Sequence, residues 1–160
     1  VCYTLGPSAQ GTLATFLRGR RVPMVAGYDP LFQFMHEEDV ATAIALTVDK
    51  RMRGIFNVAG PQPLPLSVII REAHRQPVPL PMGVLRQLLG RFGLPRLPPG
   101  ALYHLQYPIV VDARAFQAAT GFTHRYDEVR IIQSFLEAWP PPRGRREELF
   151  DRLEALGVRR

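Results

Sequence analysis

The chain is divided into short elements by apolar runs that end at glycine or proline. Runs of branched and aromatic residues predict strands, whereas apolar residues spaced three and four apart predict helices. The expected strands cover residues 1–5, 22–26, 31–36, 55–58 and 109–111. The expected helices cover residues 8–19, 39–49, 66–74, 82–92, 112–120 and 127–139. Because strands and helices alternate, the pattern predicts an α/β fold.

Several residues define the expected ends of these elements. Ser8, Asp112 and Asp127 are expected to cap the helices that follow them, because their short side chains can accept hydrogen bonds from free amides. Gly121 is expected to end the helix that begins at Asp112. Three of the five residues in 77–81 are prolines, which donate no backbone hydrogen bond, so this segment is expected at a sheet edge or as an extended connector.

The expected strands are too few for a complete doubly wound sheet, so the pattern fits half of a domain better than a whole one. Residues 1–139 are expected to form this part, 140–144 a proline-rich spacer, and 145–160 an amphipathic C-terminal helix. The chain begins on an apolar strand without an initiator methionine. We therefore expect that a further part precedes it.

Composition excludes several classes of protein. No window holds eighteen uninterrupted apolar residues, so no membrane-spanning helix is expected. Cys2 is the only cysteine, which excludes an internal disulfide and a cysteine-based metal site and favours the reducing cytoplasm. The net charge of +6 would attract phosphates. The sequence lacks zinc-finger spacing and interleaved aromatic residues, so a basic nucleic-acid module is the least favoured hypothesis.

One block carries more information than the rest. Residues 34–41, F-M-H-E-E-D-V-A, join an apolar strand that ends in His to a helix that begins with acids. This block resembles the F-I-H-V-D-D-V-A signature of NAD-dependent epimerase/dehydratases, the extended short-chain dehydrogenase/reductases. Further segments resemble family motifs in the same order: 1–7 (R-P-x-N-V-Y-G-P), 27–30 (G-Y-D-P of UDP-glucose 4-epimerase-like proteins), 56–60 (Y-N-V-G-x-G), 111–114 (D-T-S-K) and 120–122 (L-G-F).

The resemblance implies the C-terminal part of a Rossmann-like enzyme, with the last strands of the parallel sheet and a small mixed α/β substrate subdomain. The family's G-x-x-G-x-x-G turn and Y-x-x-x-K pair have no counterpart, and Lys50 is the only lysine. The chain would therefore be inactive alone. Its parent would act on a nucleotide-sugar or similar small molecule, with NAD or NADP held mainly by an N-terminal Rossmann half. A homodimer is compatible with this reading.

The chain departs from the family pattern just before the His block. The family often has Arg-Asp there, whereas this chain has Phe32 and Gln33. The change removes a cation that would help to neutralise a substrate phosphate. It opens the alternative of an apolar or lipid-linked substrate, and it motivates a second hypothesis, a non-catalytic protein that senses a dinucleotide or metabolite.

The candidate site residues follow from the same resemblance. Tyr3 takes the place of an Asn at the edge of the nicotinamide pocket and is the cofactor-binding candidate; the simpler alternative is a packed strand residue. The substrate-binding candidates are Gln33, His36, His104, Gln106 and Arg114. For His36 the simpler alternative is a bond to backbone at the strand end, and for Arg114 it is solvation on a helix surface. No catalytic residue and no metal ligand is expected in this chain.

Overall fold

The computed structural model describes residues 2–8, 10–91, 94, 96–97 and 99–141. It is an α/β structure whose strands pair two by two. The strands are β1 (Tyr3–Leu5), β2 (Arg21–Val25), β3 (Leu31–Phe32), β4 (Phe34–His36), β5 (Leu64–Pro65) and β6 (Gln76–Leu80). The pairs β1–β4 and β2–β6 are parallel, and β3–β5 is antiparallel. The predicted α/β class is therefore confirmed.

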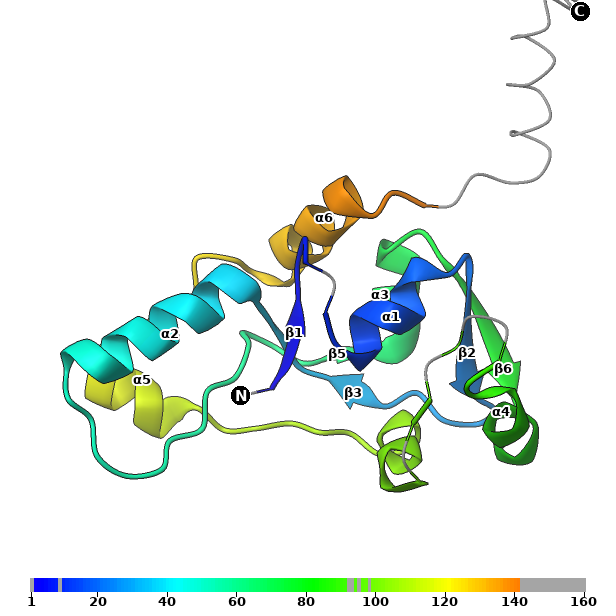
Figure 1. Cartoon of the computed structure of the whole chain (residues 1–160), viewed down its shortest axis with the longest axis horizontal. Helices are drawn as coiled ribbons and strands as arrows, with labels where there is room; N and C mark the ends of the chain where they lie inside the picture. Colours follow the sequence, from blue (N-terminus) through cyan, green and yellow to red (C-terminus); the bar gives the residue numbers. More distant parts are fainter. Residues whose placement is uncertain (1, 9, 92–93, 95, 98, 142–160) are drawn as a thin grey trace, which may run out of the picture.

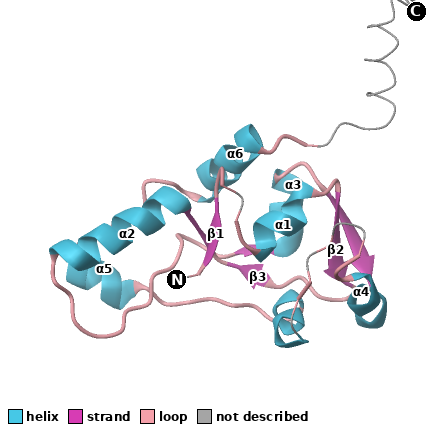
Figure 2. Ribbon diagram, in the orientation of Figure 1, coloured by secondary structure: helices cyan, strands magenta, loops and turns pink. Residues whose placement is uncertain are grey.

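Six α-helices and one 3₁₀ helix surround these strands in the described residues (Figures 1 and 2). They are α1 (Thr12–Arg18), α2 (Glu37–Asp49), α3 (Leu66–Glu72), α4 (Met82–Leu88), η1 (Pro99–Leu105), α5 (Arg114–Thr120) and α6 (Glu128–Ala138). Helices α2 and α5 lie together at one end of Figure 1, and β2, β6 and α4 lie at the other. The expected helix at 145–160 and most of the spacer at 140–144 fall outside the described residues.

The expected strand 31–36 is two strands, separated at Gln33. β3 pairs with β5, whereas β4 pairs with β1, so the chain changes partner between them. The buried side-chain amide of Gln33 bonds backbone on both sides, donating to Gly60 O at 2.9 Å and accepting from Val111 N at 2.9 Å. A side chain thus makes the contacts that a continuous ladder would otherwise supply.

The proline-rich segment forms strand β6, as expected for a sheet edge. Its register places Pro77 opposite Val22 and Pro79 opposite Met24 in a sheet of two strands. Alternate residues of a strand point their amides away from the partner, so prolines two apart leave the ladder on the other positions intact.

Two expected strands do not form. Residues 55–58 have no strand structure, and one backbone bond, from Cys2 N to Val58 O at 3.0 Å, joins them to the start of β1. Within 109–111, Ile109 makes an isolated parallel bridge with Phe32. Both segments are apolar enough for strands, but in the described structure neither forms a ladder of consecutive residue pairs.

The expected caps are correct in part. Asp127 caps α6 by accepting from Arg130 N at 2.8 Å, and Gly121 ends α5 in the left-handed conformation. Ser8 does not cap α1, whose N-cap is Gly11; it bonds instead to the Glu37 carboxylate at the start of α2. The cap of α5 is Ala113, although the Asp112 carboxylate accepts from Arg114 N at 2.9 Å.

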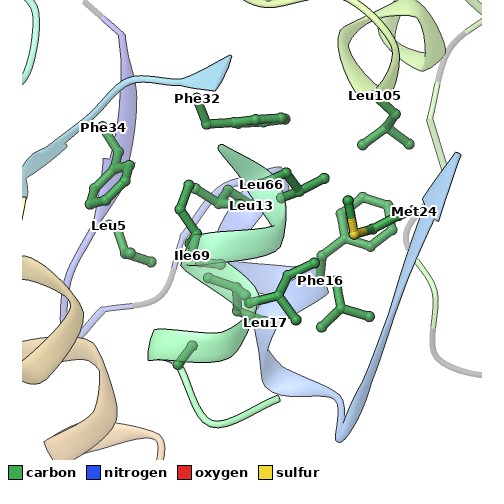
Figure 3. Packing of buried hydrophobic residues seen from close by; sticks show 14 of the residues in the cluster. Leu5, Leu13, Phe16, Leu17, Met24, Phe32, Phe34, Leu66, Ile69 and Leu105 are labelled. Atoms are coloured by element: carbon green, nitrogen blue, oxygen red, sulfur yellow. The ribbon is translucent and has the colours of Figure 1, made fainter. Parts of the chain in front are cut away.

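Two apolar clusters hold the fold together. The larger one packs α1 and α3 against the strands, and Figure 3 shows its members Leu13, Leu17, Leu66 and Ile69 interleaved. The smaller one lies between α2 and α5 and contains Met35, Ala43, Phe116 and Phe122. Each apolar side chain buried in this way contributes about 1.5–3 kcal/mol.

Some of the regularly spaced apolar side chains of helix α2 are exposed to solvent. Ile44 is 59% exposed, Val48 is 72% exposed, and Ile55 beyond the helix is fully exposed. The residues that α2 buries are Asp39 and Ala43. The helix therefore packs through a narrow stripe, and its other apolar residues form an uncovered face in the described chain.

Gly60 provides a sharp test of this packing. A Cβ placed on it would lie 1.8 Å from Phe34 O, whereas a Cβ on Gly83 in α4 meets nothing within 4 Å. We expect Gly60→Ala to lower the free energy of unfolding by more than about 3 kcal/mol, since the clash is with backbone. Gly83→Ala should raise it by about 0.5–1 kcal/mol. Urea denaturation measures both, and equal effects would contradict the close approach at Gly60.

Candidate functional site

A cavity of about 350 Å³ opens beside β1, between α1, β2, β3, α3 and η1. Figure 3 shows Phe32 on one side of this region, with Leu13 and Leu66 near it and Leu105 from η1 across from it. Its walls come from eight short segments spread over residues 2–111. The lining residues are Cys2, Tyr3, Thr12, Leu13, Phe16, Val22, Pro23, Phe32, Leu66, Leu97, His104, Leu105, Ile109 and Val111.

The described walls of the cavity are mostly apolar. None of the lining residues is Asp, Glu, Lys or Arg, and the polar groups among them are those of Cys2, Tyr3, Thr12 and His104. A concave apolar pocket with a few polar groups is the usual form of a small-molecule site. This cavity is therefore the candidate functional site.

Tyr3 and Phe32 form one wall together. Their ring centroids lie 5.0 Å apart at an interplanar angle of 34°. Burial raises the pKa of the Tyr3 phenol, so this hydroxyl stays protonated and can donate a hydrogen bond at neutral pH. The cofactor-binding candidate thus lines the cavity and presents a neutral polar group beside an aromatic surface.

Cys2 is the nucleophile nearest to this wall among the described lining residues, but its thiol is engaged. Sγ accepts from Gly60 N at 3.1 Å and contacts Tyr3 O at 3.4 Å. Burial raises the pKa of this thiol, and the hydrogen bond from Gly60 only partly opposes the rise. A protonated, half-buried thiol is a structural group and a weak nucleophile.

Gln33, His36 and Gln106 lie outside the cavity lining, and the first two are buried. Gln33 is 5% exposed and bonds backbone, as described above. His36 is 2% exposed; its Nδ1 accepts from Glu38 N at 3.2 Å, its Nε2 donates to Ser134 Oγ at 3.0 Å, and its ring stacks on Tyr126 at 3.7 Å. Gln106 follows η1, and its backbone N–H donates to Tyr103 O at 3.0 Å.

The other two candidates differ from each other. His104, on η1, lines the cavity and is exposed. Arg114 is on the surface, with its guanidinium paired to Asp112 at 2.6 Å, and it does not line the cavity. This pairing holds the pKa of Asp112 at about 2, so the ion pair persists throughout the neutral range. Of the candidates, the structure thus brings Tyr3 and His104 to one cavity.

Asp39 holds the start of α2 in place without capping it. Its buried carboxylate accepts from Arg125 N at 3.1 Å and from Tyr126 N at 3.3 Å, both 86 or more positions away in sequence. The N-cap of α2 is His36, whose ring accepts from Glu38 N. The acid block of the signature therefore anchors the segment before α6, and a carboxylate there also suits the positive end of α2.

Most of the apolar wall could not be identified as a site from sequence. Leu13, Phe16 and Leu66 have the helical spacing of ordinary core residues, and the sequence predicts only that they are buried.

Within the part of the chain that the structure describes, no group of three or more potential metal ligands gathers. There is also no described helix with the length and apolarity that a bilayer crossing requires.

No protein-family model matches the chain. Uncharacterized proteins of Mycobacterium bovis and Mycobacterium tuberculosis are 30% identical over 134 residues, which cover 82% of this chain and 36% of theirs. The chain thus spans about a third of the length of these relatives.

Solved structures share the fold at low sequence identity. TunA, described as an NAD-dependent NDP-hexosamine 5,6-dehydratase of tunicamycin biosynthesis, has a TM-score of 0.61 and 12% identity, covering 89% of this chain and 44% of TunA. MoeE5, solved with UDP-glucuronic acid and NAD, has a TM-score of 0.60 and 20% identity over 86% of this chain and 44% of MoeE5. A UDP-glucuronic acid 4-epimerase of Bacillus cereus has a TM-score of 0.60 and 8% identity, covering 86% and 42%.

These likenesses establish the fold. The chain shares a Rossmann-like mixed α/β fold with these solved structures over less than half of their length, so the expected fold class is confirmed. The structural neighbours include NAD-dependent epimerases and dehydratases of nucleotide-sugars. The dinucleotides and sugars in their structures are properties of those proteins.

The Gln33 bridge can be tested by removing its polar atoms. Gln33→Leu keeps a similar volume but leaves Gly60 O and Val111 N without the partners that the structure gives them. We expect a loss of about 2–4 kcal/mol in the free energy of unfolding, since each buried unpaired group costs about 1–3 kcal/mol. Gln133→Leu, on the exposed face of α6, should change it by less than about 0.5 kcal/mol. A mild effect of Gln33→Leu in urea denaturation would contradict the bridge.

The raised pKa of Cys2 predicts slow alkylation. Less thiolate is present at neutral pH than in free cysteine, so iodoacetamide should react more slowly and the rate–pH curve should shift to higher pH. Mass spectrometry follows the single cysteine without ambiguity. The same protein in concentrated urea, where burial is lost, is the control and should behave like free cysteine. A folded-state curve at or below that of the unfolded protein would show that the thiol is not protected.

Proposed function

We propose that this chain forms the substrate-binding portion of an NAD(P)-dependent oxidoreductase of the epimerase/dehydratase kind. The observation that carries the proposal is the cavity beside β1, into which the motif-derived candidates Tyr3 and His104 both extend. The shared fold with NAD-dependent epimerases and dehydratases supports it. A nucleotide-linked sugar is the substrate class suggested by those neighbours.

The residues of this chain do not suffice to hold a dinucleotide. A pyrophosphate needs a glycine-rich turn before a helix, where bare amides receive it, and the sequence has no G-x-x-G-x-x-G run. Tyr3 could at most contact the edge of a nicotinamide ring, through its aromatic face or its protonated hydroxyl. The proposed oxidoreductase therefore includes a Rossmann half that binds NAD or NADP and carries the Y-x-x-x-K pair.

The uncovered apolar face of α2 fits this arrangement. Ile44 and Val48 leave more than half of their surface in water, and Ile55 leaves all of it. Apolar residues gathered in this way mark surfaces that another part of a protein covers. In the proposal that part is the Rossmann half, which would bring the dinucleotide to the Tyr3 side of the cavity.

Dinucleotide binding by the full gene product tests this function. We expect NAD or NADP to bind with a dissociation constant in the range of about 1 μM to 1 mM that is typical of enzyme ligands. Tyr3→Ala should weaken this binding several-fold, whereas Tyr28→Ala, an exposed tyrosine outside the cavity lining, should leave it unchanged. Isothermal titration calorimetry measures both, with thermal melting to check folding. No binding of either dinucleotide at millimolar concentration would overturn the proposal.

A further inference from the structure

We infer that the cavity binds an uncharged, mostly apolar small molecule that carries a hydroxyl or carbonyl group, in place of a sugar linked through a diphosphate. The inference rests on the proposed function and narrows its substrate class. It is carried by the chemistry of the lining residues, by the positions of the nearby cations and by the size of the cavity.

The lining offers no counter-charge to a diphosphate. The fourteen lining residues that the structure describes include no Arg or Lys, and ten of them are Leu, Phe, Val, Ile or Pro. Moving a phosphate from water to such walls would leave its charge without a partner, which costs several kcal/mol or more. Proteins that bind diphosphates use charge-assisted bonds, above all from arginine forks.

Two arginines, Arg114 and Arg75, are held by other groups of the protein, whereas Arg96, next to the lining residue Leu97, is exposed and is not among the described lining residues. Arg114, three residues after the lining residue Val111, forms a two-point ion pair with Asp112. Arg75 is 4% exposed and donates from Nε to Leu17 O at 2.7 Å and from Nη2 to Trp139 O at 2.9 Å, so it fixes backbone near the chain's exit from α6. A phosphate in the cavity would have to break one of these arrangements to gain Arg114 or Arg75 as a partner.

Phe32 occupies the wall position at which the motif comparison expected a cation. It is 4% exposed, its ring lies against Tyr3, and its backbone bridges to Ile109. Two aromatic side chains, from β1 and β3, therefore make an apolar surface of two tilted rings. Such a surface suits a ring or an acyl chain and has no group that could neutralise an anion.

The polar groups of the lining can hydrogen-bond one polar group of the ligand. Cys2 is occupied by Gly60 N, which leaves the hydroxyls of Thr12 and Tyr3 and the ring of exposed His104 to receive a hydroxyl or carbonyl. The volume of about 350 Å³ equals that of roughly a dozen water molecules at about 30 Å³ each. The apolar body of the ligand should thus contain about that many non-hydrogen atoms.

The test compares 1-decanol with UDP-glucose as ligands of the full gene product by titration calorimetry. 1-Decanol has the size and the single hydroxyl that the cavity predicts, and UDP-glucose carries the diphosphate. We expect saturable binding of 1-decanol with a negative heat-capacity change, the mark of apolar burial. UDP-glucose should bind at least a hundredfold more weakly. Tighter binding of UDP-glucose than of 1-decanol would overturn the inference.

Two tryptophan variants locate the binding. Ile109→Trp places a large ring in the lining and should weaken 1-decanol at least tenfold. Val110→Trp, at the adjacent position, which is 51% exposed and outside the lining, should leave the affinity unchanged. If Ile109→Trp does not melt cooperatively, Leu97→Trp serves as the filling variant from a half-buried lining position. Equal affinities for the filling variant and Val110→Trp would show that the alcohol binds elsewhere and overturn the inference.

Failure of the inference and failure of the proposed function give different results. Dinucleotide binding together with preference for UDP-glucose would retain the oxidoreductase and refute the apolar substrate. If the protein binds 1-decanol but neither NAD nor NADP, the proposed redox function is refuted. Apolar alcohols would then be ligands and not substrates of a redox reaction. Binding of both a dinucleotide and 1-decanol supports the two together.

Discussion

The close approach of the Ala59–Gly60 turn to strand β4 is the contact on which the rest of the structure depends. Gly60 lies so near Phe34 O that only hydrogen fits in place of a side chain. Its amide bonds Cys2 Sγ, its carbonyl accepts from Gln33, and the carbonyl of Ala59 accepts from His124 Nε2 at 2.8 Å. One turn thus joins the start of β1, the break between β3 and β4, and the segment before α6, which together fix one side of the cavity.

The acid block is a second anchor at the other end of β4, and it explains why so conspicuous a motif contributes no lining residue. His36, Glu38 and Asp39 bond Ser134, Tyr126 OH and the amides of residues 125–126. These bonds join the start of α2 to α6 and to the segment before it, across 86 to 98 positions of sequence. With both ends of β4 held, Phe32 and Tyr3 meet at a fixed angle, so the motif acts on the cavity by positioning strands.

Sequence reasoning predicted what depends on local chemistry. The proline strand at 76–80, the Asp127 cap and the left-handed Gly121 each follow from one residue type and its backbone. It failed where partners far away in sequence decide the outcome. Ser8 has the chemistry of a cap but bonds Glu37 instead. Gln33 separates β3 from β4, with its side-chain amide bonded to both Gly60 O and Val111 N. Residues 55–58 form no strand in the described structure. For the same reason Tyr3 and His104 could be proposed from motif positions, whereas Leu13, Phe16 and Leu66 looked like ordinary core.

The shared fold suggests a nucleotide-linked sugar as substrate, whereas the apolar cavity suggests an uncharged apolar molecule. The physical argument favours the apolar molecule. The fold depends on the close approach at Gly60, the hydrogen bonds at both ends of β4 and the packing of α1 and α3. None of these features involves a charged group of a ligand. Substrate class is set by the few side chains that face the cavity, and these can change without altering the fold. Here these side chains include Tyr3 and Phe32, whose ring centroids lie 5.0 Å apart. A charged ligand would have to displace this pair of rings or lose its own hydration against them. An apolar ligand would pack against both rings. The same scaffold that receives nucleotide-sugars in its structural neighbours is therefore compatible with an apolar alcohol or ketone in this chain.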